Sequence, residues 1–224
     1  MADVKVSALP AATALTRTEE VPVIQGGASV RTTVSAMGPK LHPGYSSTRV
    51  YSGNWGVLTN NAPPYSGYMF FHPVFIPVAT TIKSLILNVS SAQGGGSTAY
   101  VGLYSSLANG NPGSALIRST SLSTSTAGAK VYTLGSPLAV AAGTYWGATW
   151  FSATGGTVYS YNYQGIGSWA VGASQSDYLI GATVGLMDQS GTNYSSGLPS
   201  NAITGFNMSA MLSIPIPAVQ FGVN

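Results

Sequence analysis

Asp177 and Asp188 are the only acidic residues after position 20, and they are the first candidates for chemistry in this sequence. Hydrolysis of a polysaccharide normally uses a pair of carboxylates held at a set separation. The stretch SQSDYLIGATVGLMDQSG could bring the two aspartates together across a hairpin. Their Ser- and Gln-rich surroundings instead favour solvated acids in loops, so we predict no catalytic role for either.

The histidines and serines offer no better starting point for chemistry. His42 and His72 each precede a proline, and neither has Asp, Glu or Cys at a metal-binding spacing. The Gly-x-Ser-x-Gly turn that exposes a nucleophilic serine is absent. The segment QGGGSTAY (93–100) lacks the lysine and the following helix of a phosphate-binding loop, so we interpret it as a flexible hairpin loop. The sequence therefore predicts a protein that is not an enzyme and that holds no metal and no cofactor.

The composition points to a protein that associates with other chains. Only 6% of the 224 residues are charged, against about 25% in ordinary soluble domains. Neutral Gly, Ser, Thr, Asn and Tyr must therefore cover the surface, which gives little like-charge repulsion between copies. The net charge is +3, but the eight Lys and Arg are scattered and no two are adjacent. Nucleic-acid binding needs clustered cations, so we expect no nucleic-acid partner.

Targeting and membrane signals are also weak. The chain has no cysteine, which excludes disulfides and thiolate metal sites. The start, MADVKVSALPAATAL, lacks the basic and apolar regions of a secretory signal, so we expect no signal peptide. The longest apolar run, residues 138–151, is too short and too rich in Gly and Thr to cross a bilayer. We therefore expect no membrane insertion.

Hydrophobic residues alternate with a period of two, which predicts an all-β fold. In KSLILNVSS, Leu85, Leu87 and Val89 share one face. In AYVGLYSS, Val101 and Leu103 lie opposite Tyr100 and Tyr104. Short strands with frequent turns, such as NGNPG (109–113), favour an antiparallel β-sandwich or jelly-roll-like domain.

Three regions follow from this pattern along the chain. VPVIQGGASVRTTV (21–34) predicts a hairpin around Gly26-Gly27, so residues 1–38 form an N-terminal arm. Residues 39–64 are interpreted as a linker and entry to the sandwich, and residues 65–224 as the sandwich. The tail SIPIPAVQFGV carries Pro215 and Pro217, which predicts an edge strand or an extended arm.

Two aromatic stretches are candidates for contact with a glycan or with another subunit. On a strand, AAGTYWGATWFS (141–152) places Trp146 and Trp150 on one face, to be covered by a loop of the same chain, a neighbouring subunit or a sugar. The stretch TVYSYNYQGIGSW (157–169) places three tyrosines on one face of a strand and a tryptophan beyond it. Its candidate residues are Tyr159, Tyr161, Tyr163 and Trp169.

The opening segment KVSALPAATALTRTEEVPVIQGGASVRTTVSAM (5–37) resembles the N-terminal segment of tailed-bacteriophage virion proteins, tail fibres especially. Residues 70–95, 100–116 and 138–149 also resemble a tail-fibre-type β-sandwich. The resemblance implies attachment to the virion through the N-terminal segment. The residues expected to anchor it are Leu9, Pro10, Val21, Pro22, Val23, Gln25, Gly26 and Gly27.

The resemblance implies a virion structural protein that forms a homotrimer and is made in the host cytoplasm. Its partners would be other proteins of the tail or capsid, and a glycan on the host cell surface. A tail-fibre or tail-tip protein is the first interpretation. The alternative is a capsid decoration, or cement, protein that stabilises the head, since the chain is short and contains no shaft repeats. A glycan-degrading tailspike ranks third because carboxylates are so few.

Overall fold

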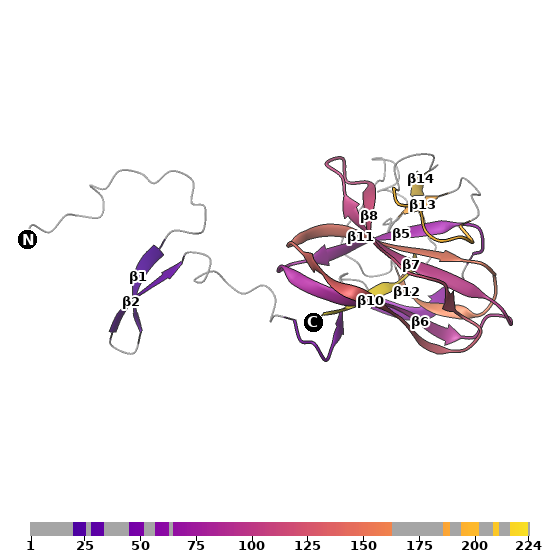
Figure 1. Ribbon diagram of the computed structural model, residues 1–224, viewed down its shortest axis with the longest axis horizontal. Helices are drawn as coiled ribbons and strands as arrows, with labels where there is room; N and C mark the ends of the chain where they lie inside the picture. The colour runs from indigo at the N-terminus through magenta and orange to yellow at the C-terminus, as the bar shows by residue number, and fades with distance from the viewer. Residues whose placement is uncertain are drawn as a thin grey trace, which may run out of the picture. The chain divides into compact units, whose positions relative to one another are not determined.

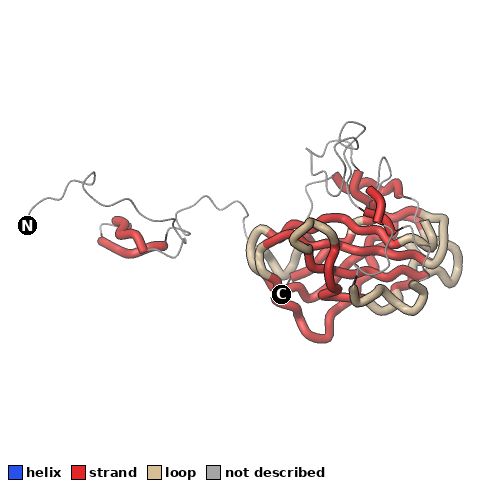
Figure 2. Tube along the Cα trace, turned by 90° about the horizontal axis from the view of Figure 1, so that it is seen from above, coloured by secondary structure: helices blue, strands red, loops and turns tan. Residues whose placement is uncertain are grey.

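The computed structural model describes residues 20–25, 28–33, 45–51, 57–62, 65–162, 186–188, 194–201, 208–210 and 216–223. The chain forms two compact units, Met1–Pro43 and Gly44–Asn224. The regular elements within the described residues are all β-strands, joined by loops and turns, and no helix occurs among them (Figure 2). The prediction of an all-β fold is confirmed.

The first unit contains a two-stranded antiparallel hairpin. Strand β1 (Glu20–Gln25) pairs with β2 (Ala28–Thr33), and Gln25 lies opposite Ala28. The predicted pairing of these two strands as an N-terminal hairpin is confirmed. Four of the expected anchoring residues lie in β1, namely Val21, Pro22, Val23 and Gln25. The others lie outside the described residues and are Leu9, Pro10, Gly26 and Gly27.

The second unit is built from two antiparallel sheets packed face to face (Figure 1). The β6 sheet runs in the order β15-β12-β6-β16-β3, with β10 paired to β6 and β4 paired to β12. Its strands are β3 (Val50–Tyr51), β4 (Val57–Ala62), β6 (Thr80–Ser91), β10 (Gly128–Val140), β12 (Thr157–Asn162), β15 (Ile216–Pro217) and β16 (Val219–Val223).

The β11 sheet faces it and runs in the order β14-β13-β5-β11-β7-β8, with the short β9 paired to β7. Strand β11 lies between β5 and β7 and pairs with both along nearly its whole length. The strands of this sheet are β5 (Met69–Ile76), β7 (Thr98–Ser106), β8 (Pro112–Arg118), β9 (Leu122–Ser123), β11 (Gly143–Phe151), β13 (Leu186–Asp188) and β14 (Met208–Ala210).

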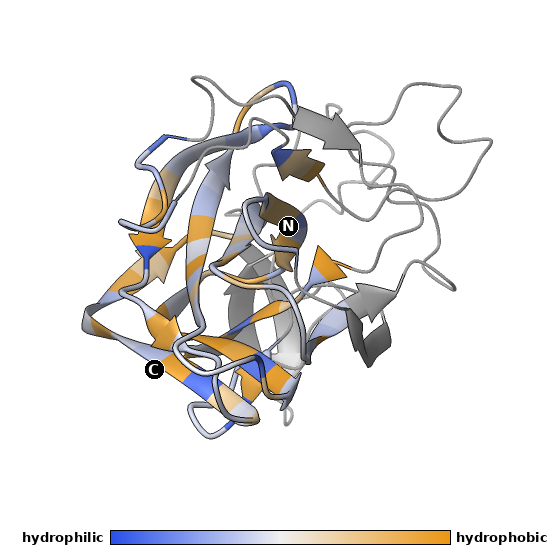
Figure 3. Cartoon of the chain, turned by 90° about the vertical axis from the view of Figure 1, so that its right-hand side faces the viewer, coloured by the Kyte–Doolittle hydropathy of each residue, from blue (hydrophilic) through white to orange (hydrophobic). Residues whose placement is uncertain are grey.

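The main hydrophobic core lies between the two sheets and follows from the period-two pattern. Leu85, Leu87 and Val89 of β6 are buried against Val101 and Leu103 of β7. Each set was predicted to share one face of its strand, and both predictions are confirmed. Apolar and polar segments alternate along the strands in Figure 3, as expected when one face of each sheet is buried.

The C-terminal tail departs from the prediction of an edge strand or arm. Strand β15, which contains Pro217, does lie at an end of its sheet. Strand β16, however, pairs with β6 on one side and β3 on the other, and Val219, Phe221 and Val223 are buried. The reason is that β16 itself contains no proline, so its amides can pair on both sides.

The glycine-rich segment after β6 also differs from its prediction. It was interpreted as a hairpin loop, but β6 and β7 belong to opposite sheets, so the segment crosses from one sheet to the other. Gln93 at its start is buried and holds the connection in place. Two hydrogen bonds join it to Thr124: the Gln93 backbone N–H donates to the Thr124 carbonyl at 3.0 Å, and the Thr124 hydroxyl donates to Gln93 Oε1.

Candidate functional site

Strand β11 buries aromatic side chains on both of its faces. Tyr145 and Phe151 face the core between the sheets, whereas Trp146 and Trp150 face the opposite side. This alternation is the one predicted from the sequence. Trp146 and Trp150 belong to a second hydrophobic cluster on the outer side of the β11 sheet. The cluster consists of Met69, Phe71, Tyr104, Trp146, Ala148, Trp150, Leu186, Tyr194 and Leu198.

Residues 194–201, which we call the covering segment, pack over this outer face. The hydroxyls of Tyr100 and Tyr104 on β7 donate hydrogen bonds to the Ser195 and Pro199 carbonyls at 2.8 and 2.7 Å. The Ala115 amide of β8 donates to the Ser200 carbonyl at 2.9 Å. Burial of the Tyr104 ring raises the pKa of its phenol, so this donor stays protonated.

The contact role expected for Trp146 and Trp150 is corrected accordingly. Their side chains are 0% and 3% exposed, so neither can reach a sugar or a second subunit in this conformation. Of the three coverings that the sequence left open, a segment of the same chain is the one found here. The two indoles are core residues of the β11 sheet.

Tyr159 is the one member of the predicted tyrosine row of β12 whose side chain is described, and it is exposed. Val158 and Ser160 are buried, whereas Tyr159 between them is 40% exposed. This is the predicted orientation for Tyr159. Tyr161 belongs to the same strand, and Tyr163 and Trp169 lie outside the described residues.

His72 of β5 is a buried structural residue that joins the two sheets. Its Nε2 accepts a hydrogen bond from the Val219 amide of β16 at 2.9 Å, so the ring is neutral and its proton is on Nδ1. Nδ1 lies 3.3 Å from the Pro73 carbonyl. The ring is fully buried, and this desolvation lowers the pKa of His72 to about 4, against the weaker opposing effect of the Pro73 carbonyl.

We expect His72 to make the stability of the sandwich dependent on pH. Between pH 6.5 and 4 the unfolded chain binds a proton that folded His72 does not, so the free energy of unfolding falls as the pH falls. The loss should reach ~3 kcal/mol near pH 4, at 1.36 kcal/mol per pKa unit. Urea unfolding measured at several pH values should show this slope in the wild type and a shallower one in His72→Gln.

His42→Gln is the control for this measurement, because it removes the other histidine of the chain. It should keep the wild-type slope. An equally steep slope in His72→Gln would contradict the assignment of the pH dependence to His72.

Asp188 differs from the solvated loop acid that the sequence favoured. It lies in strand β13, its side chain is 1% exposed, and its Oδ2 accepts a hydrogen bond from the Tyr194 hydroxyl at 2.6 Å. The carboxylate thus connects β13 to the covering segment. Asp177, the other candidate for carboxylate chemistry, lies outside the described residues.

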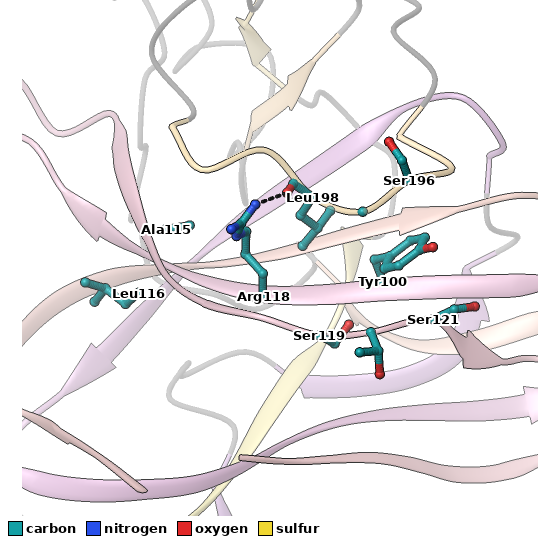
Figure 4. A pocket seen from close by; sticks show the side chains of 10 residues that line it. Tyr100, Ala115, Leu116, Arg118, Ser119, Ser121, Ser196 and Leu198 are labelled. Atoms are coloured by element: carbon teal, nitrogen blue, oxygen red, sulfur yellow. Dashed lines mark hydrogen bonds between the residues drawn. The ribbon is translucent and has the colours of Figure 1, made fainter. Parts of the chain in front are cut away.

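A polar hollow lies beside the covering segment, at the end of β8 (Figure 4). Its volume is about 640 Å³, within the range typical of small-molecule sites. One wall comes from β7, β8 and the residues after β8, and the other from the covering segment. The lining residues are Tyr100, Ala115, Leu116, Arg118, Ser119, Thr120, Ser121, Ser196, Gly197 and Leu198.

The covering segment approaches β7 and β8 closely enough to form this hollow because residue 102 is glycine. A Cβ atom at Gly102 would lie 2.8 Å from Leu198 Cδ1 and 3.0 Å from the Ile117 carbonyl oxygen. The Arg118 guanidinium then reaches across and donates a hydrogen bond to the Leu198 carbonyl at 3.0 Å, shown as the dashed line in Figure 4. The hollow therefore depends on a contact between residues some eighty positions apart.

No functional role was predicted from the sequence for the residues of this hollow. One signal was available: Arg118 is the only charged residue between Lys83 and Lys130, and hydroxyl residues follow it directly. The proximity of Arg118 to residues 196–198 could not be predicted from the spacing of residues near it in the sequence.

A comparison with known protein families finds no family model that matches the chain, and a comparison with curated proteins finds no match either. Within the described residues, no group of three or more His, Cys, Asp or Glu side chains is placed to hold a metal ion. No helix in that part of the chain has the length and apolarity to cross a membrane.

Proposed function

We propose that this chain is a non-enzymatic structural protein of a tailed-bacteriophage virion, assembled as a homotrimer at the tail fibre or tail tip. The observation that carries the proposal is that the segment resembling phage N-terminal segments contains a separate β-hairpin unit. A two-stranded hairpin is marginal in water without a surface to pack on. Docking on another virion protein would supply that surface.

The sandwich suits the exposed end of such a protein. Its described surface carries scattered large apolar side chains, including Val50, Tyr65, Val131 and Tyr159. Tyrosines and neutral polar groups are well suited to wet interfaces with proteins or glycans. Modest affinity per site is sufficient for adhesion, since three subunits and many copies raise the effective concentration.

A capsid decoration protein is the second candidate, because a surface with few charges suits many symmetric contacts between neighbouring copies. The two locations predict different copy numbers, because a capsid lattice repeats far more often than a tail. Gel densitometry of purified virions should give tens of copies for a tail protein. Hundreds of copies would assign the chain to the capsid instead.

We expect charges placed in β1 to prevent incorporation into the virion. The double variant Val21→Asp, Val23→Asp puts two carboxylates into the proposed docking strand. Burial of these carboxylates against a partner would remove their hydration, which is unfavourable for unpaired charges. Incorporation should fall by about tenfold or more, which corresponds to ~1.4 kcal/mol of docking energy. Quantitative mass spectrometry of virions purified from cells infected with the variant phage measures this.

The matched control is Val78→Asp, Val131→Asp, which makes the same two changes at exposed positions of the sandwich. This variant should enter virions normally. If the β1 variant is incorporated as well as the control, the proposed anchoring function is wrong.

A further inference from the structure

We propose that the hollow beside the covering segment binds an acidic saccharide, with the sugar carboxylate on Arg118 and a sugar ring against Tyr100. Three features of the hollow carry this inference: a cation that has no carboxylate partner within the described residues, an immobilised aromatic ring, and a group of hydroxyls. Each supplies one element of saccharide recognition.

Arg118 supplies a cation that no carboxylate of the described residues neutralises. Its side chain is exposed, and its one hydrogen bond within the described residues is the 3.0 Å contact with the Leu198 carbonyl. Among the described residues, no acidic side chain lines the hollow. A guanidinium has five N–H donors in a planar fork, so most of them remain for a ligand, and the fork matches a carboxylate. The contact with Leu198 also fixes the side chain before a ligand arrives.

Tyr100 supplies a flat apolar surface that is held in place. Its hydroxyl donates to the Ser195 carbonyl at 2.8 Å, and its ring lies 5.8 Å from the Trp150 ring at an interplanar angle of 43°. The ring is only partly buried, and in Figure 4 it lies between Ser196 and Ser121. Little conformational entropy is lost when a ligand packs on a ring that is already fixed.

The remaining lining is rich in hydroxyls, which suits a ligand that is itself a polyol. Thr120, Ser121 and Ser196 are exposed and make no side-chain hydrogen bond within the described part of the chain. The Ser119 hydroxyl accepts from the Val101 amide at 2.8 Å, which leaves its own proton to donate. Hydroxyls both donate and accept, so they can match the hydroxyls of a sugar.

The single cation favours a carboxylate over a phosphate ester as the acidic group. Phosphate carries a charge near −2 and is usually met by several cations or by backbone amides at a helix N-terminus. Arg118 is the only charged residue among the described residues of the lining, and no helix lies in that part of the chain. One guanidinium balances one carboxylate.

The binding proposal concerns the isolated protein and does not depend on the virion assignment. If the proposed function also holds, the acidic saccharide would be the host-surface ligand, and only this assignment of the ligand rests on the proposed function. A binding assay in solution and a count of chains per virion therefore fail independently.

The test is a titration of the ¹⁵N-labelled full-length protein with four sugars, followed by NMR. D-glucuronate and N-acetylneuraminate are the acidic probes, D-glucose is the neutral control, and D-glucose 6-phosphate is the phosphate control. We expect at least one acidic sugar to bind with a Kd on the order of 1 mM, about tenfold tighter than glucose, with shifts at Tyr100 and residues 118–121.

Ser121→Asp tests the site without removing a contact seen within the described residues, because Ser121 is exposed. The carboxylate of the introduced aspartate would repel an acidic ligand. Binding should weaken at least about fivefold, in line with one unfavourable charge contact. Ser136→Asp makes the same change at an exposed position outside the hollow and should bind as the wild type does. Arg118→Lys should retain more affinity than Arg118→Gln.

Four results would overturn the proposal. These are no response to either acidic sugar, equal affinity for glucose, preference for the phosphate ester, and unchanged binding in Ser121→Asp. Binding of the acidic sugars with shifts confined to residues away from the hollow would overturn the assigned position in the same way.

Discussion

Replacing Trp146 by alanine is expected to destabilise the sandwich by about 4 kcal/mol, at the upper end of what a single core substitution costs. The indole is completely buried at the centre of the outer cluster, between β5 and β7, which pair with β11 on both sides. Its loss would leave a cavity within the outer cluster, which also contains Phe71, Tyr104 and Leu198. The covering segment would lose much of the apolar surface that holds it against the sheet.

Chemical denaturation of the purified chain measures this effect, and Tyr159→Ala provides the matched control. Tyr159 is an aromatic residue in a strand of the other sheet, and its side chain is 40% exposed. Its removal should cost no more than about 1 kcal/mol, because little buried contact is lost. If the two variants lower the free energy of unfolding equally, burial in the outer cluster does not contribute more to stability than an exposed aromatic residue does.

The residues that share one face of a strand could be predicted because this grouping depends on local alternation alone. The side chains of β6, β7 and β11 point to the two sides in turn, so the sequence indicated which residues share a face. For β7, both faces proved to be buried, one by the opposite sheet and one by the covering segment. Alternation identifies the two faces of a strand but not what covers each of them.

The order of strands in the sheets could not be predicted, since it depends on pairing between distant segments. Strand β16 completes the β6 sheet from the end of the chain, inserted between β6 and β3. The two prolines before it favoured an edge, and the pattern of Val219–Val223 itself contains no information on its partners. The connection from β6 to β7 shows the same limit, because its turn residues suited a hairpin as well as a crossover.

The candidate binding site was missed for a related reason. Tyr100 and Arg118 belong to neighbouring strands, but the opposite wall comes from Ser196 to Leu198, far along the sequence. The sequence directed attention to large aromatic residues, and those of β11 proved to be buried. The residues that remain accessible beside them are a tyrosine whose hydroxyl is already engaged and one arginine.

The covering segment couples stability to the proposed binding site. The hydrogen bonds from Tyr100, Tyr104 and Arg118 to its carbonyls close the outer cluster and also form one wall of the hollow. Variants that loosen this segment should therefore weaken the site without altering a lining residue. For this reason the binding test uses Ser121, which makes no such contact.

The second large effect is expected at Gly147, where alanine should cost about 4 kcal/mol. Gly147 lies opposite His72 in the pairing of β11 with β5, and an added Cβ would collide with the imidazole ring, at 2.6 Å from its Cε1 atom. The ring is fully buried and cannot move aside without breaking its bond from the Val219 amide. The expected value combines overpacking of about 1–3 kcal/mol with a buried amide left unpaired, at about 1–3 kcal/mol.

Gly135→Ala is the control, because a Cβ at that position of β10 meets no atom within 4 Å. It should change the free energy of unfolding by less than about 0.5 kcal/mol. A double-mutant cycle then assigns the cost of Gly147→Ala to its cause. In a His72→Ala background the added methyl group has space, so the same substitution should cost at least about 1 kcal/mol less than in the wild type. A cost that is unchanged in that background would show that the strain lies in the strand itself and that the contact between Gly147 and His72 does not determine the packing of the two sheets.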